Sequence, residues 1–348
     1  MTLVHQLGRS PRAAATRRVA PSRSAWLLGA LAVTVAAALA SVAFGVRIVG
    51  WADIVDGLTG SEETVSSAAV AKRIPRTLLA LVAGAALGLA GAVMQGVTRN
   101  PLADPGLLGI TQGASLAVVS GMAFFGLTAP SSYVWVAIAG SAAAAVFVWA
   151  VGSLGRGGAT PLKLALAGAA TAAACTSLVS AVLLPRIDVM DSFRFWQIGG
   201  VGGASYDRIG LVVPFLVVGA LVCLASARGL NSLALGDDVA AGLGQRVGTT
   251  RLLAAAGAVT LCGAATAVAG PIGFVGLVVP HLCRLLIGVD HRWLLPASAV
   301  TGAALLTSAD VIGRVIARPS EVDVGIVTAL IGAPFFIWIV RRTKVRAL

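Results

Sequence analysis

Long apolar stretches separated by short polar loops run along most of this chain. Ten of them approach the roughly 20 residues that an α-helix needs to cross a bilayer. They span residues 26–46, 74–97, 106–126, 132–154, 161–184, 206–227, 249–269, 272–288, 293–313 and 323–340. The pattern predicts an all-α fold, that of a polytopic membrane protein with ten transmembrane helices.

The distribution of basic residues between these stretches indicates the orientation in the membrane. An even number of spans places both termini on one side, and short cytoplasmic loops carry an excess of Lys and Arg. With a cytoplasmic N-terminus, 17 of the 26 basic residues fall on the inner side and nine on the outer side. The charges therefore predict a multi-pass plasma-membrane protein with both termini in the cytoplasm.

The first 25 residues are basic and rich in Ser, Pro and Arg. We expect a disordered cytoplasmic tail over 1–25, followed by one transmembrane domain over 26–348. The alternative is a cleaved secretory signal, since the Ala-Leu-Ala stretch at 38–40 resembles a cleavage site. The apolar run over 26–46 exceeds the 7–15 residues of a usual signal core, which favours a retained span.

Composition supports the membrane class and limits the chemistry. Charged residues make up 11% of the chain, against about 25% in soluble domains. The net charge of +12 lies in short loops and tails, so it does not indicate nucleic-acid binding. The four cysteines fall inside apolar stretches without a CxxC pair, which indicates small buried side chains. Neither a metal site nor a bound cofactor is expected.

The chain also lacks the residues of nucleotide chemistry. It has no GxxxxGK[ST] stretch, and none of its lysines follows a phosphate-binding loop. No nucleophile triad and no pair of neighbouring catalytic carboxylates stands out. We expect a protein that is not an enzyme, so any ATP hydrolysis that drives it must occur in a separate subunit.

One longer polar insert, at about 228–248, interrupts the apolar pattern on the predicted inner side. After the glycine break at Gly236, Asp237 is expected to cap a short helix and Asp238 to favour its dipole. Gly244 fits the end of that helix. The result is a coupling loop with a helix of about two turns, far too short to span a membrane.

The side chains of this short helix predict that it needs support. Val239, Ala240 and Leu243 are expected to share one face. An isolated helix of this length is marginal in water, so it must rest on a partner surface. That surface belongs either to the spans of this chain or to another protein.

Several arginines lie on the predicted outer side, against the usual charge bias. Arg73 and Arg76 follow Lys72 at the start of the second span, and Arg314 ends the ninth. They either snorkel at the interface or bind an acidic partner or anionic substrate. Asp310, four residues before Arg314, is expected to pair with it, with a proton relay as the alternative.

Two further groups of residues leave alternatives open. Gly84 and Gly88 form a GxxxG pattern within LVAGAALGLAGAVMQG, which fits close helix packing, a transport path or a dimer contact. His281 and Arg284 lie near the inner end of the eighth span. We expect them to be interfacial, satisfied by backbone groups or lipid headgroups.

Four segments carry a resemblance to a known family. They are RIPRTLLALVAGAALGLAGAVMQGVTRNPLADPGLLGITQGA (73–114), NSLALGDDVAAGLGQRV (231–247), GPIGFVGLVVPHLCRLLIGVDHRWLLPASAVTGAALLTSAD (270–310) and SEVDVGIVTALIGAPFF (320–336). In order and spacing they resemble the FecCD-type permeases of ABC importers, which take up ferric siderophores, haem or cobalamin. The resemblance covers nearly everything from the second span onward.

The resemblance implies partners and site residues. It implies a second permease subunit (the same chain or a similar one), cytoplasmic ATP-binding subunits and an extracytoplasmic substrate-binding protein in a bacterial inner membrane. It implies that Arg73, Arg76 and Arg314 meet acidic residues of the binding protein. It also implies that the insert is the coupling segment on the ATPase, with Gly236, Asp237, Asp238, Ala240, Leu243 and Gly244.

One position departs from the family pattern. The family usually has a proline where Asp323 stands in the EVDVG stretch. Proline pre-sets the start of a helix and Asp can cap one, so we expect the tenth span to form behind a more acidic outer surface.

The expected function is import of an iron complex, with a ferric siderophore first and haem or cobalamin as alternatives. The chain offers no evident residues to ligate iron, so the chelate is expected to pass intact. Two rivals come from other classes. One is a proton-coupled secondary transporter that uses Asp310, and the other is a membrane scaffold that transports nothing.

Overall fold

The computed structural model describes residues 22–60, 64–155 and 160–342, and this part of the chain is helical without strands. The long helices are α1 (Arg23–Ala43), α3 (Val65–Thr98), α4 (Ile110–Phe125), α5 (Pro130–Ser153), α6 (Pro161–Leu183), α8 (Tyr206–Ala225), α11 (Val247–Ala269), α12 (Val275–Ile287), α13 (His291–Ile316) and α14 (Val324–Arg342). The short ones are α2 (Trp51–Thr59), η1 (Pro105–Leu108), α7 (Ile187–Ile198), α9 (Ala227–Leu233) and α10 (Asp237–Gly242).

Each of the ten apolar stretches forms one of the long helices. Seven of these, all but α4, α12 and α14, are long and apolar enough to cross a membrane. The remaining three contain shorter apolar segments, so the count of ten crossings stays a prediction. The helix α1 begins at Arg23, slightly before the expected start, and most of the expected tail lies outside the described residues.

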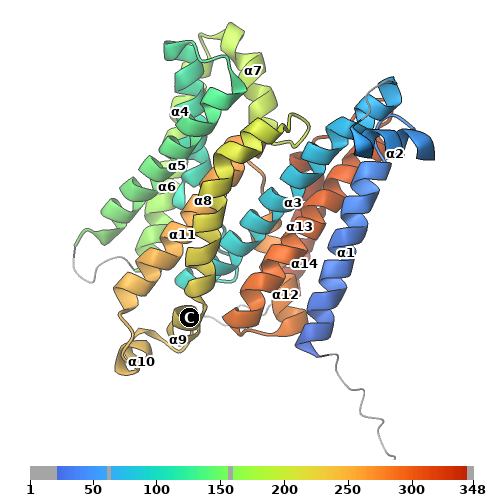
Figure 1. Ribbon diagram of the computed structural model, residues 1–348. Coiled ribbons are helices and arrows are strands. Elements are labelled where there is room, and N and C mark those ends of the chain that lie inside the picture. Colours follow the sequence, from blue (N-terminus) through green and yellow to red (C-terminus); the bar gives the residue numbers. More distant parts are fainter. Residues whose placement is uncertain (1–21, 61–63, 156–159, 343–348) are drawn as a thin grey trace, which may run out of the picture.

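Short helices lie at both ends of the bundle (Figure 1). The helices α2 and α7 lie at one end, which we call the α2 end, and α9 and α10 lie at the other, which we call the α10 end. Neither α2 nor α7 was expected, because stretches of 9 and 12 residues are too short to span. The two ends are the places where this chain has polar structure outside the apolar bundle.

Close backbone contact holds the centre of the bundle together. A Cβ atom at Gly84 or Gly88 of α3 would collide with backbone oxygens of α13, at Gly302 and Ser298 respectively. Gly91 meets Gly276 of α12 in the same way. The GxxxG pattern of α3 therefore serves packing inside the subunit, the contact that small residues permit in lipid.

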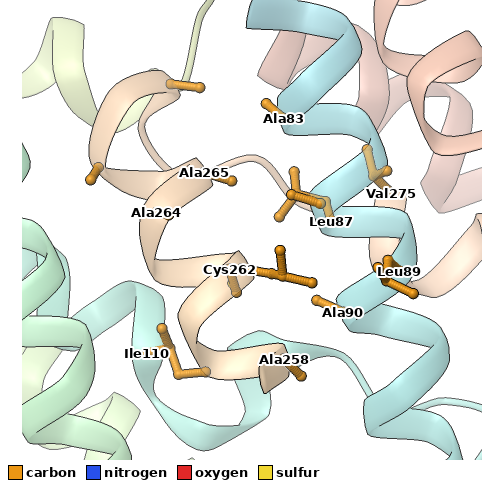
Figure 2. Close-up of a cluster of buried hydrophobic side chains, with 14 of the residues drawn as sticks. Ala83, Leu87, Leu89, Ala90, Ile110, Ala258, Cys262, Ala264, Ala265 and Val275 are labelled. Atoms are coloured by element: carbon orange, nitrogen blue, oxygen red, sulfur yellow. The ribbon is translucent and has the colours of Figure 1, made fainter. Parts of the chain in front are cut away.

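On its other side, α3 packs against α11. Figure 2 shows Leu87 and Ala90 of α3 opposite Ala258, Cys262 and Ala265 of α11. All of these side chains are buried, and the four cysteines are buried as well, as the sequence predicts. Alanines on α3 and α11 thus permit this second close interface, beside the one that glycines form between α3 and α13.

We expect Gly88→Ala to lower the free energy of unfolding by about 1–3 kcal/mol, because the added methyl group overpacks the contact between α3 and α13. Gly29 on α1 is the matched control, since a Cβ there meets no atom within 4 Å. Unfolding in mixed micelles measures both variants. Equal stability of Gly88→Ala and Gly29→Ala would show that α3 and α13 do not approach as described.

Candidate functional site

At the α2 end, Arg73 of α3 is turned into the protein. Its guanidinium donates hydrogen bonds to the carbonyl oxygens of Val42 (3.0 Å), Ala43 (2.8 Å) and Arg47 (2.6 Å). The last carbonyls of a helix have no partner within it, and here a side chain from α3 supplies one. Arg73 is 6% exposed and holds the end of α1 in place.

Arg314 of α13 binds the same end of α1. It donates to the carbonyl oxygens of Ser41 (3.0 Å) and Phe44 (3.2 Å) and to the Ser41 hydroxyl (2.6 Å). Its guanidinium also lies 2.8 Å from the carboxylate of Asp310, which confirms the pair expected from their spacing. Arg318 adds hydrogen bonds to the Gly45 carbonyl.

Asp310 has a second partner that lies far away in the sequence. Arg76 of α3 donates to it from Nη2 at 2.8 Å and from Nε at 3.0 Å. The carboxylate is 1% exposed, so two guanidinium groups share one buried negative charge. This arrangement accounts for Asp310 as the centre of an ion-pair network that joins α3 to α13.

The network reaches the surface at Glu321. Arg76 donates from Nη1 to the Glu321 carboxylate at 2.8 Å, and the Glu321 side chain is 40% exposed. A cavity of about 270 Å³ opens beside this pair, lined in part by Arg47 and Lys72, which are exposed. The three predicted docking arginines are therefore brought together, with Arg76 facing the surface carboxylate and Arg73 and Arg314 facing inward.

At the α10 end, the short helix forms with one difference from the expected capping. Its N-cap is Gly236, whose φ of 107° suits glycine, so Asp237 is the first helical residue and not the cap. The end is as expected: Gly244 has a φ of 82°, and its N–H donates to Ala241 while that of Gln245 donates to Ala240. These two bonds form a Schellman motif.

The prediction that Val239, Ala240 and Leu243 share one face of this helix is wrong. Ala240 is fully buried against the chain, whereas Val239 and Leu243 are 51% and 63% exposed. Positions four apart lie on one side of a helix, which leaves Val239 and Leu243 together on the outer side. The helix α10 thus rests on this chain through Ala240 and presents an apolar pair to its surroundings.

Asp237 fastens the helix to the bundle. Its carboxylate pairs with Arg99, at the end of α3, and with Arg251 of α11 at 3.1 Å. Asp238 is exposed and makes no ion pair among the described residues. Of the two neighbouring aspartates, the first binds within the chain and the second faces outward.

Asn231 of α9 makes a connection that the sequence analysis did not identify. Its Oδ1 accepts hydrogen bonds from the His291 backbone N–H (2.9 Å) and ring Nδ1 (2.8 Å), and its Nδ2 donates to Asp290 (2.7 Å). This amide and the Arg292 N–H lower the pKa of Asp290 below its usual range. The motif NSLALGDD contains Asn231, but its partners are about 60 residues away and leave no local signal.

Comparison with known proteins identifies the family of this helical chain. A family model described as the FecCD transport family matches residues 33–342. The chain belongs to the FecCD transport family. Its members are permeases, so this chain is a multi-pass membrane protein and a transport subunit of the ABC importer class.

Similar proteins carry different iron compounds and cobalamin. The ferric enterobactin permease FepD of Escherichia coli (strain K12) is 44% identical over 326 residues, covering 93% of this chain and 97% of FepD. The hemin permease HmuU of Yersinia pestis is 42% identical over 281 residues, 78% of this chain and 82% of HmuU. The cobalamin permease BtuC of Halobacterium salinarum is 40% identical over 294 residues, 83% of this chain and 77% of BtuC.

A solved structure supports the fold independently. An inward-facing ABC transporter described as metal-chelate type superposes with a TM-score of 0.80 at 28% identity, covering 92% of this chain and all of that one. The described residues of the present chain contain no group of three or more His, Cys, Asp or Glu side chains placed to hold a metal ion.

The departure at Asp323 leaves the last helix intact. The helix α14 begins at Val324, and the backbone N–H groups of Ile326 and Val327 donate to the Asp323 carbonyl. Burial raises the pKa of the Asp323 carboxyl, and the negative charge of the nearby Glu321 raises it further. An acidic pair, Glu321 and Asp323, therefore stands beside Arg76.

Proposed function

We propose that this chain is the permease subunit of an ATP-driven importer that moves a ferric siderophore into the cytoplasm. The 44% identity with a ferric enterobactin permease over nearly the full length of both chains carries this proposal. A second permease subunit, the same chain or a similar one, completes the path. Cytoplasmic ATP-binding subunits drive it, and lipid surrounds the bundle.

The proposal places the α10 end in the cytoplasm, as the excess of basic residues predicts. Both termini then lie on that side, and the α2 end faces the binding protein. The exposed pair Val239 and Leu243 supports α10 as the coupling helix, because apolar side chains at a helix tip fit a partner surface. In this proposal Gly236, Asp237 and Gly244 shape and anchor that helix, while Asp238 lies beside the contact.

Because Arg73 and Arg314 are buried, Arg76 is the arginine that we propose binds the substrate-binding protein. Its Nη1 already binds one surface carboxylate, that of Glu321. A carboxylate from the binding protein fits the same guanidinium, because such pairs are bidentate and charge-assisted. The exposed Arg47 and Lys72 along the cavity add attraction at a distance.

If a carboxylate of the binding protein replaces that of Glu321 on Arg76, two substitutions should have opposite effects on docking. Glu321→Gln is expected to tighten docking up to about fivefold, since an ion pair with an exposed partner contributes at most about 1 kcal/mol. Arg76→Gln is expected to weaken docking about tenfold or more, because a charge-assisted hydrogen bond is lost. Binding of the purified binding protein at low and high salt measures both effects.

The paired substitution also contains its own control. If Arg76 and Glu321 served only the fold, both variants would weaken docking or leave it unchanged. A change in opposite directions that fades at high salt identifies competition for one guanidinium. Weaker docking of Glu321→Gln would therefore contradict the proposed exchange.

The cargo is tested by uptake in iron-starved cells that lack the gene. Restoring the chain is expected to restore uptake of a ferric siderophore carrying labels on both iron and chelator. Both labels should enter together, because the chelate passes intact. Restoration of haem or cobalamin uptake without siderophore uptake would assign the chain to the cargo of its other relatives.

The energy source separates the proposal from a proton-coupled transporter. Proteoliposomes with the ATP-binding subunits are expected to transport only with ATP inside and the binding protein outside. Uptake driven by a pH gradient alone would favour the transporter that uses Asp310. Unchanged uptake in cells without the chain would favour the scaffold.

A further inference from the structure

A cavity of about 560 Å³ lies at the α10 end, and neither Val239 nor Leu243 belongs to its lining. It is bounded by the start of α1, the end of α3, the segment after α9 and the turn between α12 and α13. The side chains that matter for its chemistry are those of Arg23, Gln95, Arg99, Arg284, Asp290 and His291.

The guanidinium of Arg284, in the last turn of α12, has no ion-pair partner among the described residues. Its Nη1 atom is buried and makes no hydrogen bond within the described residues. No carboxylate among the described residues lies within ion-pair distance of it. Arg284 as a whole is half-buried. A partly buried cation without a counter-charge is costly, so an anion at this place would stabilise the protein.

The other arginines of the cavity are already engaged. Arg23 lies 3.8 Å from Asp290, and Arg99 pairs with Asp237. The lining contains three arginines and one aspartate, so it remains positive after these pairs form. The positive charge of the lining that remains unpaired is therefore that of Arg284.

Two hydrogen-bond acceptors complete the set. Gln95, 2% exposed, donates from Nε2 to the Gly276 and Leu277 carbonyls, which leaves its buried Oε1 without a partner. His291, 6% exposed, uses its ring Nδ1 with Asn231, which leaves its buried Nε2 without a partner. The residues that line this cavity thus include one cation with an unpartnered N–H group and two side chains with unpartnered acceptors.

We propose that this cavity binds a phosphate ester whose alcohol part carries hydroxyl groups. The phosphate pairs with the fork of N–H donors on Arg284, which matches phosphate oxygens bidentately. The hydroxyl groups donate to Gln95 and to His291. The glycerol headgroup of an anionic phospholipid has this chemistry, and so does a soluble polyol phosphate.

The position of the cavity favours the phospholipid as the source. The rim carries Val289 and Leu235, which are 73% and 60% exposed. It also adjoins the start of α1, whose apolar surface is largely exposed. Basic pockets between helices at the cytoplasmic face are known places for anionic lipid headgroups.

The test uses the full-length chain in detergent with three probes: short-chain phosphatidylglycerol, short-chain phosphatidylcholine and glycerol 3-phosphate. Native mass spectrometry and thermal shift measure binding to the wild type and to Arg284→Gln. We expect phosphatidylglycerol to bind about tenfold or more weakly to Arg284→Gln, because a charge-assisted hydrogen bond is lost. Arg246→Gln removes one exposed charge at the same end and is expected to bind like the wild type.

Each outcome either tests the proposed site or identifies the source of its ligand. Binding of glycerol 3-phosphate that depends on Arg284 also supports the site and assigns a soluble ligand. Arg284→Lys keeps the charge but not the fork, and is expected to bind with intermediate affinity. Equal phosphatidylglycerol binding by wild type and Arg284→Gln overturns the proposal, as does equal binding of phosphatidylcholine. Loss of the ATP-binding subunits with lipid binding unchanged also overturns it and assigns Arg284 to a protein contact.

Discussion

Asp310→Asn is expected to lower the free energy of unfolding by about 3–5 kcal/mol, the range for removing one partner of a buried ion pair. The asparagine has nearly the same shape, so the loss comes from charge. Arg76 and Arg314 would keep their positive charges beside a neutral amide, with Arg314 2% exposed. Unfolding in mixed micelles, with and without salt, measures the effect.

Glu321→Gln provides the matched control for this substitution. It removes the other carboxylate of Arg76, but the Glu321 side chain is 40% exposed. We expect a change of at most about 1 kcal/mol, because water solvates the charge that is left. Similar losses for both variants would show that Asp310 is not the buried centre of the network.

Leu243→Asp is expected to reduce ATP-driven transport at least about tenfold while the chain folds and inserts normally. Leu243 is 63% exposed at the end of α10, so the fold does not depend on it. In the proposed assembly it lies against the ATP-binding subunits, where an unpaired carboxylate would be buried at a cost of several kcal/mol. Transport into proteoliposomes and co-purification of the ATP-binding subunits measure the result.

Leu243→Met is the conservative control, since it keeps the apolar surface and is expected to transport normally. Ala240→Asp differs from both, because Ala240 is fully buried and its replacement should displace α10 from the bundle. Normal transport by Leu243→Asp with the ATP-binding subunits still bound would contradict α10 as the coupling helix.

The sequence predicts the helices well because the apolar pattern reflects a single physical demand. Every backbone group within the bilayer must be satisfied by its own helix, so apolar stretches become helices with few exceptions. The shorter α2 and α7 escape this argument, since they lie outside the long apolar runs. The uncertain crossings, α4, α12 and α14, are also those whose apolar runs are short.

The contacts of the site residues were harder to predict from the sequence than the helices, for reasons that differ by residue. The pair of Asp310 and Arg314 follows from helical spacing, and the structure confirms it. The partners of Arg73 are backbone carbonyls at the end of α1, and carbonyls leave no trace in a sequence. Arg76 reaches Asp310 across a separation of 234 residues, which only the packing of α3 on α13 establishes.

The face of α10 shows a third kind of limit. Glycine positions predicted where the helix starts and stops, because left-handed backbone at Gly244 suits few other residues. They did not predict which side would be buried. With six residues, α10 has too few positions for apolar spacing to distinguish Ala240 from Val239 and Leu243.

The helix α13 is fastened at both ends. Near its start, Asn231 holds His291 and Asp290, and near its finish, Asp310 and Arg314 bind α3 and α1. Its 26 residues extend about 39 Å, roughly the thickness of a bilayer with its headgroups. Because side-chain contacts bind both of its ends, α13 links α9 at one end of the bundle to α1 and α3 at the other. In the proposed assembly, α13 therefore connects the end of the bundle where the ATP-binding subunits bind with the end where the binding protein docks.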